Sequence, residues 1–110
     1  GERTPRCVCK SILKPDVVFF GEAIPPAALS RSFLLASKAE VLMVVGTSAV
    51  VSPANTIPSI AKERGAKIIE INKESTHLTH TVTDIFIEQS AGEAIPRIVA
   101  ELKKKKGVAA

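Results

Sequence analysis

The chain has 110 residues, of which 45% are hydrophobic and 24% charged, a balance that excludes an intrinsically disordered protein and predicts one small globular domain. No apolar run is long enough to cross a bilayer and no secretory leader is recognisable, so we expect a cytoplasmic protein without a membrane partner. The net charge of +4 comes from the run Lys103–Lys106, and the chain has four Phe but no Trp or Tyr, so the composition argues against a nucleic-acid partner.

Short apolar, β-branched runs alternate with helical patterns along the chain. The runs that predict strands are 17–20, 41–45, 68–71 and 85–87. Helices are predicted over 27–39, over a segment that begins at 52, 53 or 55 and ends at 64, and from a capping-box pattern at 90–93 through 102. This order predicts an α/β fold with a partial doubly wound (Rossmann-like) parallel sheet and helices on both faces.

The run at 41–45 is apolar enough to lie inside a sheet, with a neighbour on each side. Right-handed crossovers place 68–71 beside it and 85–87 beyond. An open doubly wound sheet usually has about six strands. This chain supplies four at most and has no GxGxxG motif, so the pattern indicates half of a nucleotide-binding fold.

Polar residues follow two neighbouring strands of this predicted sheet. Gly46, Thr47 and Ser48 follow the run 41–45, and Asn72 follows 68–71, so all four lie at the carboxyl edge, where ligands bind. Hydroxyl and carboxamide groups can bond ribose and phosphate, and the next helix is expected to point its N-terminus at the same place. Taken alone, the same residues are explained as well or better by ordinary caps and turns.

Three further features have a functional and a plainer interpretation. Cys7 and Cys9 are close enough to be two of the four ligands of a structural zinc site. His77 and His80 lie in a polar turn over 75–83, where solvated side chains are the favoured interpretation. The run Lys103–Lys106 opens a tail that we expect to fray, and a solvated helix end is favoured over contact with an acidic partner.

Four motifs, in order, resemble the C-terminal half of a sirtuin over about residues 6–102. They are 14–22 (KPDVVFFGE), 45–48 (VGTS) with Val51 and Pro53, 71–72 (IN) and 91–93 (AGE). Sirtuins are NAD-dependent protein-lysine deacylases, so the resemblance implies removal of acyl groups from lysine, with nicotinamide and O-acyl-ADP-ribose as products. It divides the chain into a remnant of a zinc module over 1–14, half of a Rossmann-like NAD-binding domain over 15–102 and a basic tail over 103–110.

The resemblance also implies roles for individual residues. The residues expected to bind NAD are Gly46, Thr47, Ser48, Asn72 and Ala91. Those expected to bind the acyl-lysine peptide, as strands on its two sides, are Val18, Phe19, Phe20, Gly21, Ala49, Val50 and Val51. Cys7 and Cys9 resemble the second cysteine pair of a structural zinc site whose other cysteines lie outside this chain, although their CxC spacing differs from the usual CxxC.

Several family motifs are absent from the chain. They are the GAGxS motif, the first cysteine pair and the His that acts as general base, which neither His77 nor His80 matches. The resemblance therefore implies that the chain has no catalytic residue of its own and is inactive without an N-terminal half. The alternatives are a non-catalytic nucleotide- or partner-binding half-domain, and a nucleic-acid binder that works through Lys103–Lys106.

Overall fold

The computed structural model describes residues 17–19 and 21–107. Their elements are α1 (Pro26–Lys38), β1 (Val41–Val45), the 3-10 turn η1 (Ala54–Thr56), α2 (Ile57–Glu63), β2 (Lys67–Asn72), β3 (Ile85–Glu88) and α3 (Ala91–Lys105). The predicted order of helices and strands is confirmed from the first helix onward. The strand expected at 17–20 is not formed over residues 17–19, where the Glu22 N–H instead donates to the Phe19 carbonyl at 3.0 Å and closes a turn.

The strands form a parallel sheet in the order β1-β2-β3. Val45 pairs with Ile71 across β1 and β2, and Ile69 pairs with Ile85 across β2 and β3, as the crossover rule predicted. In the described part of the chain, however, β2 is the central strand and β1 is an edge. Val41, on β1, is 53% exposed. The outer side of β1 is therefore open to pairing with another segment.

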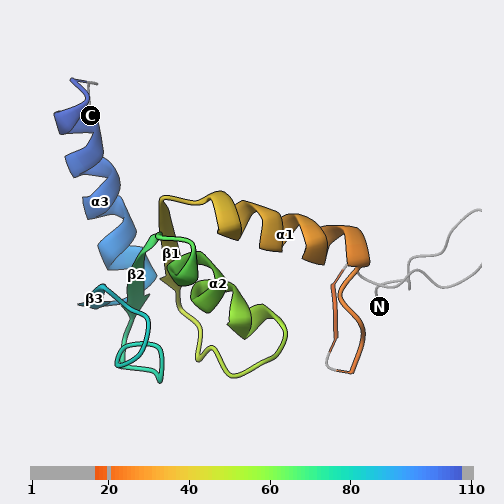
Figure 1. The fold of residues 1–110 in the computed structure, drawn as a ribbon. Helices are drawn as coiled ribbons and strands as arrows, with labels where there is room; N and C mark the ends of the chain where they lie inside the picture. Colours follow the sequence, from red (N-terminus) through yellow and green to blue (C-terminus); the bar gives the residue numbers. More distant parts are fainter. Residues whose placement is uncertain (1–16, 20, 108–110) are drawn as a thin grey trace, which may run out of the picture.

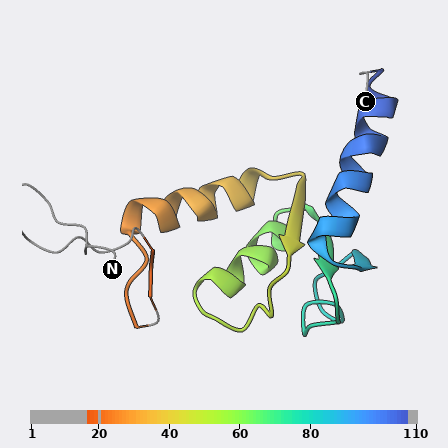
Figure 2. The same cartoon turned by 180° about the vertical axis from the view of Figure 1, so that it is seen from behind.

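Helices cover both faces of the sheet (Figures 1 and 2). α2 contacts β1 and β2, and α1 packs on α2 on the same side of the sheet. α3 contacts β2 from the other side and extends away from the sheet toward the C-terminus. This arrangement confirms the predicted α/β architecture.

The buried core lies between the sheet and α2. Its members are Ala36, Val44, Ala49, Ala61, Ala66, Ile68 and Leu78. The alanines let α2 approach the strands closely. Pro58 is buried in the first turn of α2, where its missing N–H costs no helical hydrogen bond, and Gly65, at φ +98°, ends the segment after α2.

The last helix departs from the prediction in its details. The Ser90 side chain makes no capping hydrogen bond, so the predicted capping box is not formed; the Ser90 carbonyl instead accepts from the Glu93 and Ala94 N–H groups. Pro96 lies inside the helix and removes one backbone hydrogen bond from it. The helix continues through Lys105, so the basic run does not fray at its start but occupies the last turn, where cations complement the helix dipole.

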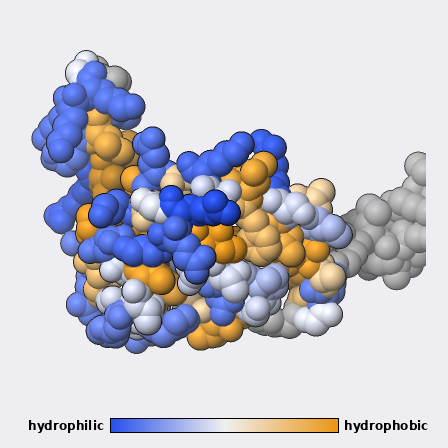
Figure 3. Space-filling view, viewed as in Figure 1, coloured by the Kyte–Doolittle hydropathy of each residue, from blue (hydrophilic) through white to orange (hydrophobic). Residues whose placement is uncertain are grey.

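The surface of α3 is divided between polar and apolar side chains. Figure 3 shows an apolar stripe along this helix, flanked by hydrophilic residues. Val99 and Leu102 are exposed members of α3. No helix in the described ranges is both long and apolar enough to cross a membrane.

Candidate functional site

The carboxyl ends of β1 and β2 are tied together by two hydrogen bonds. The Gly46 N–H donates to the Ile71 carbonyl at 2.9 Å, and the Asn72 Nδ2 donates to the Thr47 carbonyl at 2.9 Å. The Asn72 Oδ1 accepts from the Lys73 N–H at 2.8 Å, so the same side chain also stabilises its own turn. The structure therefore brings together Gly46, Thr47 and Asn72, as the sequence predicted.

The loop after β1 contains two residues with positive φ, Gly46 and Ala49, and one hydroxyl without a hydrogen-bond partner among the described residues, that of Ser48. Gly46 has φ +64°, and no atom lies within 4 Å of the place where a Cβ would stand, so glycine is required by the backbone angle and not by lack of space. The Thr47 Oγ1 accepts from the Ala49 N–H at 3.1 Å and stabilises Ala49 at φ 57°. Among the described residues, the Ser48 hydroxyl has no hydrogen-bond partner and is free to meet a ligand.

These strand ends open onto a polar cavity of about 530 Å³. Its lining residues are Gly46, Thr47, Ser48, Val50, Asn72, Glu74, Ser75, Thr76 and His77. The α2 N-terminus, expected to point here, is not part of the lining, because α2 begins only at Ile57 after the turn η1. Ala91, also expected near the nucleotide, opens α3 and does not line this cavity.

A buried carboxylate lies behind one wall of the polar cavity, and sequence analysis missed it. Glu70, on β2, has no solvent exposure and accepts hydrogen bonds from the hydroxyls of Thr76, Thr79 and Thr83. The turn that carries Thr76 and His77 is thereby anchored to the central strand. A sequence signal was present, since Glu70 is the one acidic residue in an apolar run and a threonine-rich segment follows it.

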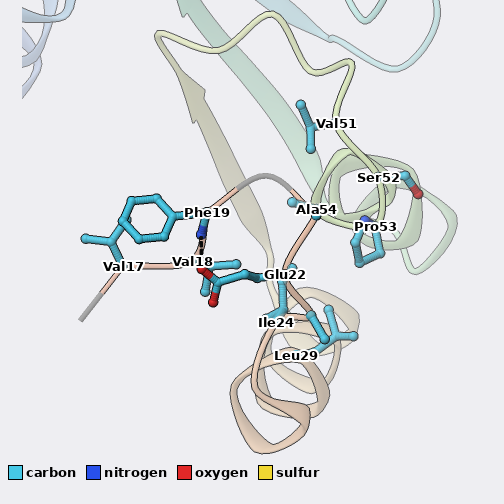
Figure 4. Close-up of a pocket in the computed structure, with 12 residues that line it drawn as sticks. Val17, Val18, Phe19, Glu22, Ile24, Leu29, Val51, Ser52, Pro53 and Ala54 are labelled. Carbon is cyan, nitrogen blue, oxygen red and sulfur yellow. Dashed lines mark hydrogen bonds between the residues drawn. The ribbon is translucent and has the colours of Figure 1, made fainter. Parts of the chain in front are cut away.

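A second, apolar cleft of about 760 Å³ lies between the segment before α1 and the loop before α2 (Figure 4). Its lining residues are Val17, Val18, Phe19, Gly21, Glu22, Ala23, Ile24, Leu29, Val51, Ser52, Pro53 and Ala54. Four of the residues predicted to contact a peptide are among them: Val18, Phe19, Gly21 and Val51. Phe20 lies outside the described residues. The Glu22 carboxylate accepts from the Phe19 N–H at 3.4 Å on the rim of this cleft.

Two other predicted peptide residues lie elsewhere. Ala49 is 5% exposed, belongs to the core and has a positive φ of 57°. Val50 is exposed and lines the polar cavity. Residues 49–51 form no strand, nor do 17–19, so the two strands that the resemblance implied around a peptide are absent from the described residues.

The clearest perturbed carboxyl lies at the opposite end of the sheet. The Asp84 Oδ1 is 2.5 Å from the Lys62 Nζ, and the Asp84 Oδ2 accepts from the Ile68 N–H at 2.8 Å. Both hydrogen bonds favour the charged form and lower the pKa of Asp84 below its usual value of 3.8. Asp84 directly precedes β3 and Ile68 is the second residue of β2, so these interactions stabilise the amino ends of the strands and not the cavity edge.

Cys7 and Cys9, the predicted metal ligands, lie outside the described residues. Within the described ranges, no three His, Cys, Asp or Glu side chains come together as a metal site. His77 and His80 lie in a polar turn, as expected.

Comparison with known proteins gives concordant matches. The sequence model of the Sir2 family matches residues 1–53. An NAD-dependent protein deacylase from Pyrococcus furiosus is 48% identical over 104 residues, which are 94% of this chain and 41% of the relative. This chain thus spans about two fifths of the length of the curated relatives it matches.

Solved structures agree with the sequence matches. A mutant Sir2 homologue in complex with ADP ribose superposes with a TM-score of 0.85 and 42% identity, covering 97% of this chain and 43% of that protein. Sir2Af2 bound to a myristoylated histone peptide gives a TM-score of 0.82 at 42% identity, covering 94% of this chain and 44% of that protein. Nearly the whole chain aligns in both sequence and fold with Sir2 proteins, so the matches support a fragment of a Sir2-family protein.

Proposed function

We propose that this chain supplies part of an NAD-dependent protein-lysine deacylase. The whole enzyme would remove acyl groups from lysine and yield nicotinamide and O-acyl-ADP-ribose. This chain would contribute one side of the NAD site, at the polar cavity, and one side of the acyl-lysine site, at the apolar cleft. The name of the Pyrococcus furiosus relative and the ligands of the two solved homologues support this assignment.

One loop carries the proposal, because residues 46–54 line both cavities. Gly46 and Ser48 line the polar cavity, whereas Val51 and Ala54 line the apolar cleft. Ala49, between them, is buried in the core and anchors the loop. A cofactor and an acyl-lysine held on the two sides of such a loop would be neighbours, which transfer of an acyl group between them requires.

Two observations support the polar cavity as a nucleotide site. The free Ser48 hydroxyl can bond an oxygen of a ribose or phosphate group. The open space beside Gly46 lets a ligand approach the backbone. When bound, NAD would supply the ADP-ribose that takes the acyl group; Ser48 and Thr47 would hold its ribose and phosphate region, and Asn72 the adenosine ribose.

In this proposal the apolar cleft holds the uncharged acyl-lysine stem. Val18 and Val51 would contact its hydrocarbon part, and Gly21 would let a peptide backbone approach. In this proposal the chain contributes no catalytic residue; among the described residues, neither His77 nor His80 lines the cleft. The general base would come from the part of the enzyme that precedes this chain.

The test measures nicotinamide release from NAD with an acetyl-lysine peptide, for residues 1–110 and for the product of the complete coding region. Only the longer protein is expected to turn over, because loss of the general base alone costs about 10²–10⁴-fold. A longer protein that releases no nicotinamide would contradict the proposed function. If it nevertheless binds nucleotide, the non-catalytic half-domain is the better assignment. Turnover by residues 1–110 at an ordinary enzyme rate would show that the preceding part is dispensable.

We also propose a cytoplasmic location and a structural zinc ion held by Cys7, Cys9 and cysteines from outside this chain. Two ligands hold zinc weakly compared with four. Residues 1–110 are therefore expected to retain less than one zinc per chain after dialysis, measured by mass spectrometry of the metal content. One tightly held zinc per chain would mean that other ligands, such as His77 or His80, complete the site.

A further inference from the structure

We infer that Glu70 is a positioning residue for the nucleotide: its buried carboxylate fixes Thr76, and with it the wall 74–77 of the polar cavity, opposite the loop 46–48. The inference rests on the proposed function only in taking the polar cavity as a nucleotide site. Glu70 itself does not line the cavity, so it would act through the turn.

Two hydroxyl groups connect the carboxylate to the backbone of the turn. The Thr79 Oγ1 accepts from the Thr76 N–H at 2.9 Å and donates to the Glu70 Oε1 at 2.6 Å. The Thr76 Oγ1 accepts from the Leu78 N–H at 3.1 Å and donates to the Glu70 Oε2. Each hydroxyl thus donates its single proton to the Glu70 carboxylate and accepts a hydrogen bond from a backbone N–H. This polarity requires an acceptor at both Glu70 oxygens.

The position of Glu70 is itself fixed by the sheet. Its backbone pairs with Val44 on one side and Phe86 on the other, and its side chain is fully buried. Asn72 follows two residues later on the same strand and therefore projects from the same face. One strand, β2, thus carries both Glu70, which anchors the turn, and Asn72, which holds the loop 46–48. We infer that β2 thereby fixes the distance between the wall 74–77 and the loop 46–48.

The third hydroxyl on Glu70 provides a matched control. Thr83 donates to the same Oε1 at 3.1 Å, yet it does not line the polar cavity. Thr76→Val and Thr83→Val each remove one hydrogen bond to Glu70 without a change of side-chain shape, and Thr76→Val also removes the acceptor of the Leu78 N–H. Only the first removes the anchor of a cavity residue. Glu70→Gln replaces one acceptor by an NH₂ donor, so one hydroxyl must reverse its direction.

The experiment titrates ADP-ribose into ¹⁵N-labelled residues 1–110 and follows the amide resonances by NMR. In the wild type, the amides of Gly46, Ser48 and Asn72 are expected to shift. Thr76→Val and Glu70→Gln should raise the dissociation constant roughly two- to tenfold, the range for one hydrogen bond. Thr83→Val should leave the dissociation constant within about twofold of the wild-type value. Thermal unfolding of each variant, measured alongside, ensures that all titrations are made on folded protein.

The outcomes separate positioning from simple stabilisation. If Thr76→Val and Thr83→Val weaken ADP-ribose binding equally, Glu70 only stabilises the fold and the inference is overturned. An absence of ADP-ribose binding in the wild type also overturns it, because the polar cavity is then no nucleotide site in this chain. The nicotinamide assay tests the proposed function separately. If the variants show the expected order of ADP-ribose affinities but the longer protein releases no nicotinamide, Glu70 keeps its positioning role and the proposed deacylase activity is wrong.

Discussion

The polar cavity and the apolar cleft share one loop but are built in different ways. The walls of the polar cavity are strand ends and a turn, joined by hydrogen bonds from Asn72 and to the buried Glu70. The walls of the apolar cleft are segments outside the sheet, and Val18, Phe19 and Val51 within them are 45%, 50% and 53% exposed. The first site is therefore formed before a ligand arrives, whereas the second exposes apolar surface that a ligand or another segment must cover.

This difference predicts different sources of binding energy. A polar group held in place loses little conformational entropy when a nucleotide binds, so each hydrogen bond adds directly to affinity. The cleft instead gains from burial of apolar surface, about 25 cal/mol per Å². Substitutions that disturb the sheet should therefore damage the polar cavity first, and substitutions before α1 should damage only the cleft.

The largest expected effect is on the stability of the sheet. Ile71 is fully buried, and its carbonyl accepts from the Gly46 N–H. Ile71→Ala should lower the free energy of unfolding by about 2–5 kcal/mol, through lost burial and the cavity left behind. Phe19→Ala, in the cleft, should lower it by no more than about 1 kcal/mol, because half of that side chain is exposed. Urea unfolding of both variants measures the contrast, and equal losses would show that the cleft is as much a part of the core as the sheet.

The next largest effect is expected from a change of backbone conformation that should alter the apolar cleft and leave the polar cavity intact. Gly21 has φ +84°, an angle that proline cannot adopt. In the proposed whole enzyme, Gly21→Pro should raise the KM for the peptide at least about tenfold and leave the KM for NAD unchanged. Gly21→Asn is the control, because asparagine tolerates positive φ. An unchanged peptide KM in the proline variant would remove the segment before α1 from the peptide site.

A smaller effect is expected from the free hydroxyl of the polar cavity. Ser48→Ala would remove the neutral hydrogen bond proposed to NAD, about 0.5–1.5 kcal/mol, and should raise the KM of the proposed whole enzyme for NAD about two- to tenfold. The urea midpoint should not move, because the Ser48 hydroxyl has no partner within the described part of the chain. A change confined to the peptide KM would mean that the two sides of the loop have been assigned the wrong way round.

The sequence was sufficient for features that depend on neighbours along the chain. The strands at 41–45, 68–71 and 85–87 and their parallel order are confirmed, because each is a short apolar run bounded by helix and turn signals. The meeting of Gly46 and Asn72 is confirmed for the same reason, since parallel strands bring their carboxyl ends to one edge.

Features that depend on contacts between distant segments were missed. The run at 17–20 has the composition of a strand, but a strand also needs a pairing partner, and residues 17–19 have none in the described structure. Ala49 is buried and has a positive φ, and neither property is indicated by an alanine in the sequence. The role of Glu70 depends on threonines six to thirteen residues later, whose hydroxyls reach it only after the turn has folded.

The smallest expected effect tests the end of the sheet opposite the polar cavity. The Lys62 ammonium, and then the Ile68 N–H, lower the pKa of Asp84 in the folded chain below 3.8. A lowered folded pKa means that Asp84 adds stability above pH about 3.8 and loses this contribution as the pH falls through the folded value. Lys62→Met removes the larger cause, so its stability should depend less steeply on pH below 3.8 than that of the wild type. Urea unfolding across this range measures the two slopes.

The same substitution also tests how far the two ends of the sheet are independent. Lys62 and Asp84 lie at the amino ends of the strands, and the polar cavity lies at the carboxyl ends. Lys62→Met should therefore leave ADP-ribose binding at pH 7 unchanged, in contrast to Glu70→Gln, which alters a buried residue in the same sheet. Equal slopes in wild type and variant would show that Lys62 does not set the pKa of Asp84. A loss of ADP-ribose affinity would show that the amino ends also determine the geometry of the polar cavity.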